Sequence, residues 1–373
     1  MQLQTQLRKL TERMQFTKLL QRDHDRKRMH LGLPLHFQAV SQLGGGVTPL
    51  TLPGSADLQS WHDASLGLKL NAQLIGSGVT PPGVTFDADV DQSLAFRMDC
   101  TGSGARGVAT YGLTLDGGLS YFQTGTTAFN VAVPLLGRTL VMNTGIYTIL
   151  DQWITPCKQM ANQTPKTRTL FGNGTDTNKP RIIPTNINGY PSLLGVGGTS
   201  SAMTDTTSAW AADVASGNAR TWSAFLVVKA PSAAPSSVNA FFSFGDNTDA
   251  DPAFLLGVRN GTNLWRTNRI NDAGTSSTRD AGALDTNWNQ FTWQQDGNNT
   301  TLRKNGSVLI NNLSLGSGQT TLSSVALFAL MRAGAVTNVM AGNFTQMMTY
   351  SSAFMTGSTM LAIENWQRGR YAL

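Results

Sequence analysis

Glutamate and histidine are scarce in this 373-residue sequence, and their scarcity excludes most hydrolytic sites. Glutamate occurs only at positions 12 and 364, so no strand can carry a cluster of catalytic glutamates. All four histidines lie within the first 62 residues, so no Ser-His-Asp or Cys-His site can form among the residues beyond them. We therefore expect a protein that is not an enzyme.

Cysteine and long apolar runs are also in short supply. The two cysteines, Cys100 and Cys157, cannot form a disulfide scaffold for a chain of this length, and no paired Cys or His spacing suggests zinc. We expect both to be buried free thiols. No apolar run has the length needed to span a bilayer, and the N-terminal segment lacks the features of a secretory signal. Synthesis and assembly in the cytoplasm are therefore expected.

Charge is concentrated at the N-terminus. The first 30 residues hold eight basic and three acidic side chains, which is a net charge of +5 out of +6 for the whole chain. An apolar stripe with helical spacing predicts a helix over residues 2–30, and basic side chains follow the stripe. We expect this helix to be an anchor within a segment of residues 1–40. The residues assigned to the anchor are Leu3, Leu7, Leu10, Met14, Arg22, Arg26, Lys27 and Arg28. The anchor could be a short coiled-coil seam or a basic docking arm, and the alternative is a helix that packs on its own domain.

The last third of the chain has the pattern of an all-β sandwich. Residues 223–229 (SAFLVVK) are apolar on both faces, which predicts a central strand with cover on each side. Further short apolar segments follow at 241–244, 254–258, 291–293, 324–330 and 344–350, separated by turn-forming residues. Asn305-Gly306 predicts a tight hairpin between residues 301–303 and 308–310, because this pair tolerates positive φ angles.

The order of these segments resembles the concanavalin A-like, laminin-G-like jelly rolls of tailed-phage virion proteins. The resemblance rests on TWSAFLVVKAP (221–231), WNQFTWQQDGNNTTLRKNG (288–306) and the terminal strand, helix and tail of residues 344–373. NKPRIIPTNINGYPSLLGVGG (178–198) and LQSWHDASLG (58–67) are similar to the entry strands of that family. The resemblance implies a jelly-roll β-sandwich in a fibre, neck or tail protein, commonly a homotrimer, with no enzymatic role.

In that family, another strand normally follows soon after the strand that residues 58–67 resemble. In this sequence the similar segment is Asp151-Gln-Trp153, which comes about 80 residues later than expected. We therefore divide the chain into an anchor (1–40), a jelly roll (41–67 and 141–373) and a β-rich insertion (68–140). The alternative is that the strands of 68–140 enlarge a sheet of the sandwich itself.

Two candidate ligand sites follow from residue types. Asp246, Asp249 and Asp251 lie in a loop between two predicted strands, where carboxylates could bind calcium, or could simply form a turn. Trp265, with Asn263, Arg266 and Asn268 beside it, could be an aromatic platform for a sugar, or an inward-facing strand residue.

Three functions therefore remain open from the sequence. The first is a structural virion protein that is held to other virion proteins by its N-terminal segment and exposes a lectin-like domain for adhesion or stabilisation. The second is a receptor-binding protein for a specific host glycan. A polysaccharide-degrading enzyme is the weakest because glutamate is scarce, and nucleic acid is not an expected partner.

Overall fold

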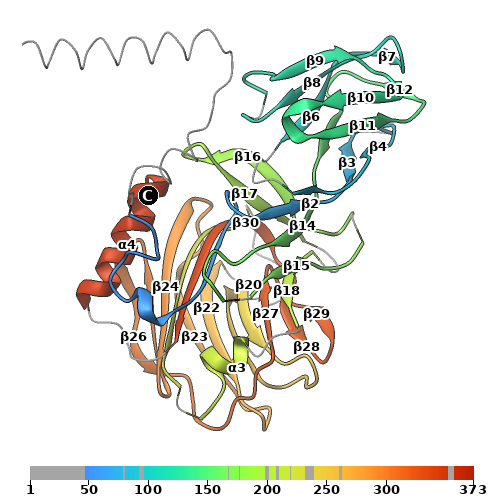
Figure 1. The fold of residues 1–373 in the computed structure, drawn as a ribbon. Coiled ribbons are helices and arrows are strands. Elements are labelled where there is room, and N and C mark those ends of the chain that lie inside the picture. Colours follow the sequence, from blue (N-terminus) through green and yellow to red (C-terminus); the bar gives the residue numbers. More distant parts are fainter. Residues whose placement is uncertain are drawn as a thin grey trace, which may run out of the picture.

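The computed structural model describes residues 47–373, except 79, 92–95, 117, 167, 176, 198–200, 207–209, 219, 232–238, 260–262 and 352–356. Nearly all of this chain is antiparallel β-structure (Figure 1). The expected anchor helix over residues 2–30, with all eight residues assigned to it, lies outside the described residues.

The first sheet is built around the doubly apolar segment predicted to be a central strand. That segment, β19, pairs with β30 on one side and β24 on the other, so the prediction is confirmed. The order of the sheet is β16 (Arg181–Ile187), β17 (Tyr190–Val196), β30 (Ala341–Ser351), β19 (Trp222–Lys229), β24 (Trp288–Asp296), β25 (Asn299–Lys304) and β26 (Ser307–Ser314), and β1 (Leu58–Asp63) also pairs with β30.

The predicted hairpin joins two strands of this sheet. Asn305 and Gly306 connect β25 to β26 with φ angles of 50° and 83°, the left-handed region that a type I′ turn requires at both positions. The prediction is confirmed, and β24, β25 and β26 form the expected meander.

The second sheet has ten strands, two of which come from either side of the insertion. Its order is β23 (Ser276–Ala283), β22 (Leu264–Ile270), β21 (Ala253–Val258), β20 (Asn239–Gly245), β27 (Ser324–Leu327), β18 (Met203–Asp205), β15 (Leu170–Gly172), β14 (Cys157–Met160), β2 (Leu68–Leu70) and β5 (Val90–Asp91). A small hairpin of β28 (Leu330–Arg332) and β29 (Ala335–Thr337) follows β27.

Aromatic side chains fill the space between the two sheets. The Trp222 ring on β19 lies 5.3 Å from Phe244 and 5.5 Å from Phe254, which belong to the opposite sheet. Trp293, on neighbouring β24, is 4.8 Å from Trp222. All four are buried. Because each buried ring contributes roughly 1.5–3 kcal/mol, this aromatic core is a main source of the stability of the sandwich.

Although β5, which also lies within the insertion, pairs with β2 at the edge of the second sheet, most strands of the insertion form a sheet of their own. Its strands run in the order β10 (Asn130–Val133), β11 (Arg138–Met142), β4 (Val84–Phe86), β3 (Gln73–Ser77), β13 (Gln152–Ile154), β6 (Arg97–Gly102), β8 (Thr110–Thr114) and β9 (Gln123–Thr126), beside a small pair of β7 (Gly104–Ala105) and β12 (Ile146–Tyr147). We call residues 73–154 the insertion unit.

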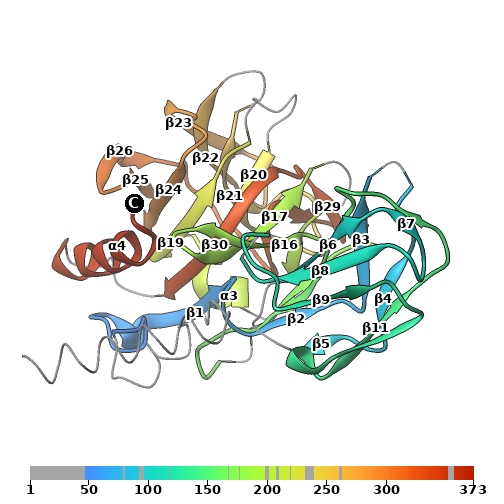
Figure 2. The ribbon, with the colours of Figure 1, turned by 90° about the horizontal axis from the view of Figure 1, so that it is seen from above.

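The strand pairings divide this region at residues other than 68 and 140. Residues 68–70 form β2, which pairs with β14 in the sandwich, while β12 and β13 come after residue 140 and belong to the insertion unit. Because β2 and β14 are neighbours, the chain leaves and re-enters the sandwich side by side, and the unit projects from it (Figure 2).

Four helical segments complete the described chain. Two are short 3₁₀ turns (Ser55–Asp57 and Pro134–Leu136), and α3 covers Trp210–Ala215. The terminal helix expected at 358–369 is α4 (Gly357–Tyr371), which packs on the outer face of the first sheet (Figure 1). Within the described part of the chain, no helix is both long and apolar enough to cross a membrane.

Candidate functional site

Trp265, the residue expected to offer a sugar platform, faces the core. Its side chain is fully buried, with ring centroids 4.5 Å from Phe291 and 5.6 Å from Phe241. Alternate residues of β22 point the same way, since Thr267 and Arg269 are buried too. The platform prediction is therefore wrong for Trp265, and the inward-facing alternative describes it.

Arg266 and Asn268 consequently lie on the other face of β22, where Arg266 is half-buried and Asn268 is buried beneath its neighbours. Arg266 Nε donates to Asp280 Oδ1 at 2.8 Å, Arg259 Nη1 donates to Asp280 Oδ2 at 2.7 Å, and Ser276 Oγ donates to Asn268 Oδ1 at 3.1 Å. These five residues are called the polar strip. The hydrogen bond from Arg266 is the main reason why the pKa of Asp280 is lowered, so its carboxylate stays ionised.

The polar strip offers fixed donors and acceptors on a partly exposed surface. Arg266 lies opposite Asp280 in the strand register, a pairing that the sequence could not supply because the two belong to different strands. Asn263, the fourth predicted residue, is exposed in the segment that precedes β22. Such groups can hydrogen-bond sugar hydroxyls, but the buried Trp265 ring adds no stacking face.

The loop expected to bind calcium is folded as a turn. Asp246 Oδ1 accepts hydrogen bonds from the backbone N–H groups of Thr248 at 2.6 Å and Asp249 at 3.2 Å, and from Ser323 Oγ at 3.2 Å. Burial raises the pKa of Asp246, but these hydrogen bonds lower it by more. Asp251 instead lies 3.7 Å from Arg332. Across the described ranges, no group of three or more acidic, His or Cys side chains could hold a metal ion.

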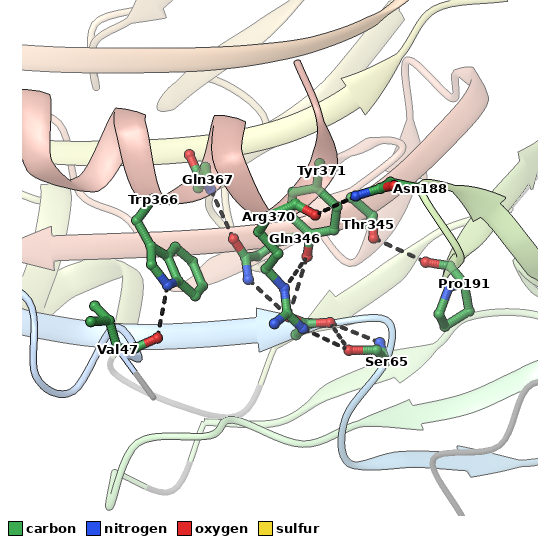
Figure 3. A network of polar contacts seen from close by, with 11 residues as sticks. Val47, Ser65, Asn188, Pro191, Thr345, Gln346, Trp366, Gln367, Arg370 and Tyr371 are labelled. Atoms are coloured by element: carbon green, nitrogen blue, oxygen red, sulfur yellow. Dashed lines mark hydrogen bonds and ion pairs between the residues drawn. The ribbon is translucent and has the colours of Figure 1, made fainter. Parts of the chain in front are cut away.

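A buried carboxylate at the end of β1 links that strand to the terminal helix, and Figure 3 shows Ser65, Gln346, Arg370 and Tyr371, which contact it. The Asp63 side chain is fully buried, and its Oδ2 accepts hydrogen bonds from Gln346 Nε2 at 2.8 Å, Arg370 Nη2 at 3.1 Å and Tyr371 OH at 3.3 Å. Its Oδ1 accepts from Ser65 N at 2.8 Å and Ser65 Oγ at 2.5 Å. Both oxygens are therefore satisfied from within the chain.

Arg370 is held on several sides. Its guanidinium carbon lies 4.3 Å from the Tyr190 ring centroid, and its backbone carbonyl accepts a hydrogen bond from Asn188 Nδ2 at 3.0 Å (Figure 3). Burial lowers the pKa of Arg370, but the charge of Asp63 and the neighbouring tyrosines raise it by more. Burial and Asp63 also raise the pKa of the Tyr371 hydroxyl, so it remains a donor. The end of the helix is thereby fixed to the sheet.

A second buried carboxylate fixes the middle of the same helix. Glu364 is fully buried, and its Oε1 accepts from Thr292 Oγ1 at 2.7 Å and from Arg303 Nε at 2.8 Å. Arg303 Nη2 donates to Oε2 at 3.2 Å. The sequence shows one glutamate in the last helix but gives no sign of its partner, which is 61 residues away.

His62 and the two cysteines have structural surroundings. His62 stacks on Trp210 with ring centroids 5.3 Å apart, and its Nε2 lies 3.0 Å from the carbonyl oxygen of Arg168. Burial lowers the pKa of His62 to about 4, so the ring is neutral at pH 7. Cys100 and Cys157 are free and buried, as predicted, and burial raises the pKa of Cys157 to about 12.

Comparisons with known proteins found solved structures that are similar over part of the chain at low identity. No family model and no curated protein matches the chain. The CBM40 domain of the Ruminococcus gnavus IT-sialidase, solved with α2,3-sialyllactose, is 18% identical, with a TM-score of 0.33 over 39% of this chain and 83% of that chain.

Two sialidase structures are also similar over part of the chain. The Streptococcus pneumoniae NanB sialidase (K499G mutant) is 16% identical, with a TM-score of 0.33 over 42% of this chain and 25% of that one. The Trypanosoma rangeli sialidase is 12% identical, with a TM-score of 0.36 over 52% of this chain and 29% of that one. At these TM-scores, none of the three similarities extends to a functional assignment.

Proposed function

We propose that this chain is a non-enzymatic structural protein of a tailed-phage virion, in a fibre, neck or tail. In this proposal the basic segment of residues 1–40 attaches it to other virion proteins, and a jelly-roll sandwich serves adhesion or particle stabilisation. The copies assemble as a homotrimer, and the protein is made in the host cytoplasm before it enters the particle. The sequence resemblance supports the virion assignment.

The observation that carries the non-enzymatic part is how the buried charges are used. Asp63 and Glu364 are each paired with an arginine and surrounded by donors, and both connect the terminal helix to the first sheet. A catalytic carboxylate needs access to a substrate and a pKa matched to proton transfer. These two carboxylates hold elements together instead, which suits a component that must remain rigid in a particle.

The test uses antibodies raised against the sandwich and purified phage particles. We expect the antibodies to label the particles at one position, and a chain without residues 1–40 to be left out of them. Protein that stays wholly in the soluble fraction of the lysate would refute the virion role. Release of reducing sugar from host polysaccharide by the purified chain would refute the non-enzymatic role.

The alternative function is a host-glycan receptor-binding protein, and the polar strip favours it. Arg266 and Asn268 lie together on one face of β22, with side chains that can recognise hydroxyl or carboxylate groups. A glycan array tests this alternative with the wild-type chain, Arg266→Ala, and Arg279→Ala as a matched control on neighbouring β23. Saturable binding lost only in Arg266→Ala would favour the glycan receptor over a purely structural role.

A further inference from the structure

The end of the insertion unit that lies away from the sandwich exposes several large apolar side chains. Figures 1 and 2 both place β7 at this end, and four loops meet there: residues 76–78 with 80–83, residues 101–109, residues 124–130 and residues 142–151. We call these loops the distal end. The exposed side chains are Val108 (69%), Phe129 (58%), Ile146 (66%), Ile149 (51%) and Leu150 (83%).

The distal end carries very little charge. Its four loops contain two charged residues, Arg106 and Asp151, and Asp151 is buried. Arg106 Nη1 donates to the carbonyl oxygen of Met142 at 3.0 Å, and its guanidinium carbon lies 5.4 Å from the Phe129 ring centroid. The charge of half-buried Arg106 is therefore held against the protein, and large apolar side chains are exposed around it.

One turn at the distal end exposes apolar residues at the cost of backbone strain. Thr148 to Asp151 form a β-turn closed by Asp151 N donating to Thr148 O at 2.9 Å, with Leu150 at the third position and a φ of 79°. Glycine or asparagine is favoured there, because a branched side chain is strained at positive φ.

Several polar groups of that turn are hydrogen-bonded within the chain. Asp151 Oδ2 accepts from Thr148 N at 2.8 Å, and Ser103 Oγ accepts from Ile149 N at 2.8 Å. Tyr147, just before the turn, is fully buried, and its hydroxyl donates to Asn143 O at 2.8 Å. The turn is thus a fixed feature that presents Ile149 and Leu150 outward. The backbone strain at Leu150 is retained at a position that exposes apolar side chains, which indicates that this surface binds another molecule.

The composition of the distal end distinguishes between partners. Binding to an anionic membrane usually requires several basic side chains, and this end has one. Recognition of an unrelated protein usually uses complementary charges around an apolar centre, and exposed carboxylates are lacking in these loops. At a rotation axis, by contrast, each residue meets its own copy, so charges are disfavoured and apolar side chains are favoured.

We propose that the distal ends of copies of this chain pack on one another around a rotation axis, with Ile149 and Leu150 at the contact. This inference deepens the assembly part of the proposed function and rests on it for the number of copies. It adds a second contact between copies, made by loops between residues 76 and 151 and not by the N-terminal anchor or the sandwich.

The test is site-directed cross-linking in the full chain. Ile149→Cys places a thiol at the proposed contact, and Val308→Cys, at a site 49% exposed on β26, is the matched control. The native cysteines are buried and free. Under mild oxidation we expect disulfide-linked dimers of Ile149→Cys at a yield at least about fivefold above the control. A yield equal to the control would overturn the proposal, even if light scattering shows an oligomer.

A second variant separates contact from folding. Leu150→Gly removes the apolar side chain and relieves the positive φ, so the turn should be at least as stable as in the wild type. We expect self-association to weaken at least about tenfold with an unchanged or higher melting temperature. Unchanged self-association would overturn the proposal.

A flotation assay with phosphatidylglycerol vesicles tests the lipid alternative. Flotation of the wild type without flotation of Ile149→Asp would also overturn the proposal, because the partner would then be lipid. The antibody labelling of phage particles tests the virion role in a separate experiment, so the virion role and the contact between distal ends can be refuted independently of each other.

Discussion

Replacing Glu364 by glutamine should destabilise the sandwich by about 3 kcal/mol, the lower end of the cost of breaking a buried ion pair. Glutamine has nearly the same shape, so no cavity forms, but the charge that compensates Arg303 is lost. Arg303 is 14% exposed and keeps a hydrogen bond to the carbonyl oxygen of Gly306, which limits the cost. The amide group would also face the Nη2 donor that now contacts Oε2 at 3.2 Å.

The expected shift in melting temperature follows from the size of the sandwich. Unfolding entropy is about 2.1 cal/mol/K per residue, so about 230 residues give about 0.5 kcal/mol/K, and a loss of about 3 kcal/mol lowers Tm by about 6 °C. Differential scanning calorimetry of the wild type and Glu364→Gln measures this directly.

The double variant Glu364→Leu with Arg303→Met provides the control. It removes both charges together, and replacement of a buried pair by apolar residues is often neutral, so we expect it to lie within about 1 kcal/mol of the wild type. A Tm for Glu364→Gln within about 2 °C of the wild type would refute the reasoning. The reasoning would also be refuted if the double variant lost as much stability as Glu364→Leu and Arg303→Met lose in sum when each is made alone.

Three further predictions concern buried side chains. The pKa of His62 falls from 6.5 to about 4 on folding, so the unfolded chain binds the proton more readily. The free energy of unfolding should therefore fall by about 3 kcal/mol as pH drops from 6.5 to 4. Urea titrations of His62→Gln should lack this pH-dependent loss. Trp265→Ala should cost about 3–5 kcal/mol in urea unfolding because it empties a core site, and any sugar binding of the soluble variant should be unchanged. Cys157 should resist Ellman's reagent in the folded protein and react once guanidinium unfolds it; reaction in the folded protein as fast as in the unfolded one would contradict its burial.

Local patterns in the sequence were sufficient for some of the architecture. Residues 223–229 are apolar on both faces, and such a strand can only be central, as β19 is. Asn305-Gly306 specifies its hairpin because few other pairs accept positive φ at both positions. In both cases the physical cause lies within a few residues of the chain.

Other features depend on contacts between distant residues. Alternation along β22 separates Trp265 from Arg266, but it does not say which of the two faces the opposite sheet. The ends of the insertion are set by the pairing of β2 with β14, about 90 residues later. Asp63 and Arg370 are 307 residues apart, and no local pattern in either segment indicates the other. Candidate sites were hardest to predict for the same reason.

The position of β1 determines how the sandwich would carry a mechanical load. The described chain begins beside the terminal helix, where Trp366 Nε1 donates to the carbonyl oxygen of Val47 at 2.9 Å, and then runs into β1, which pairs antiparallel with β30 (Figure 3). A pull from the N-terminal side along β1 would load its hydrogen bonds to β30 in shear, so that they resist together. The Asp63 network lies at the far end of that strand. A chain attached to a particle through its N-terminal segment would therefore transmit force into β1 and the Asp63 network.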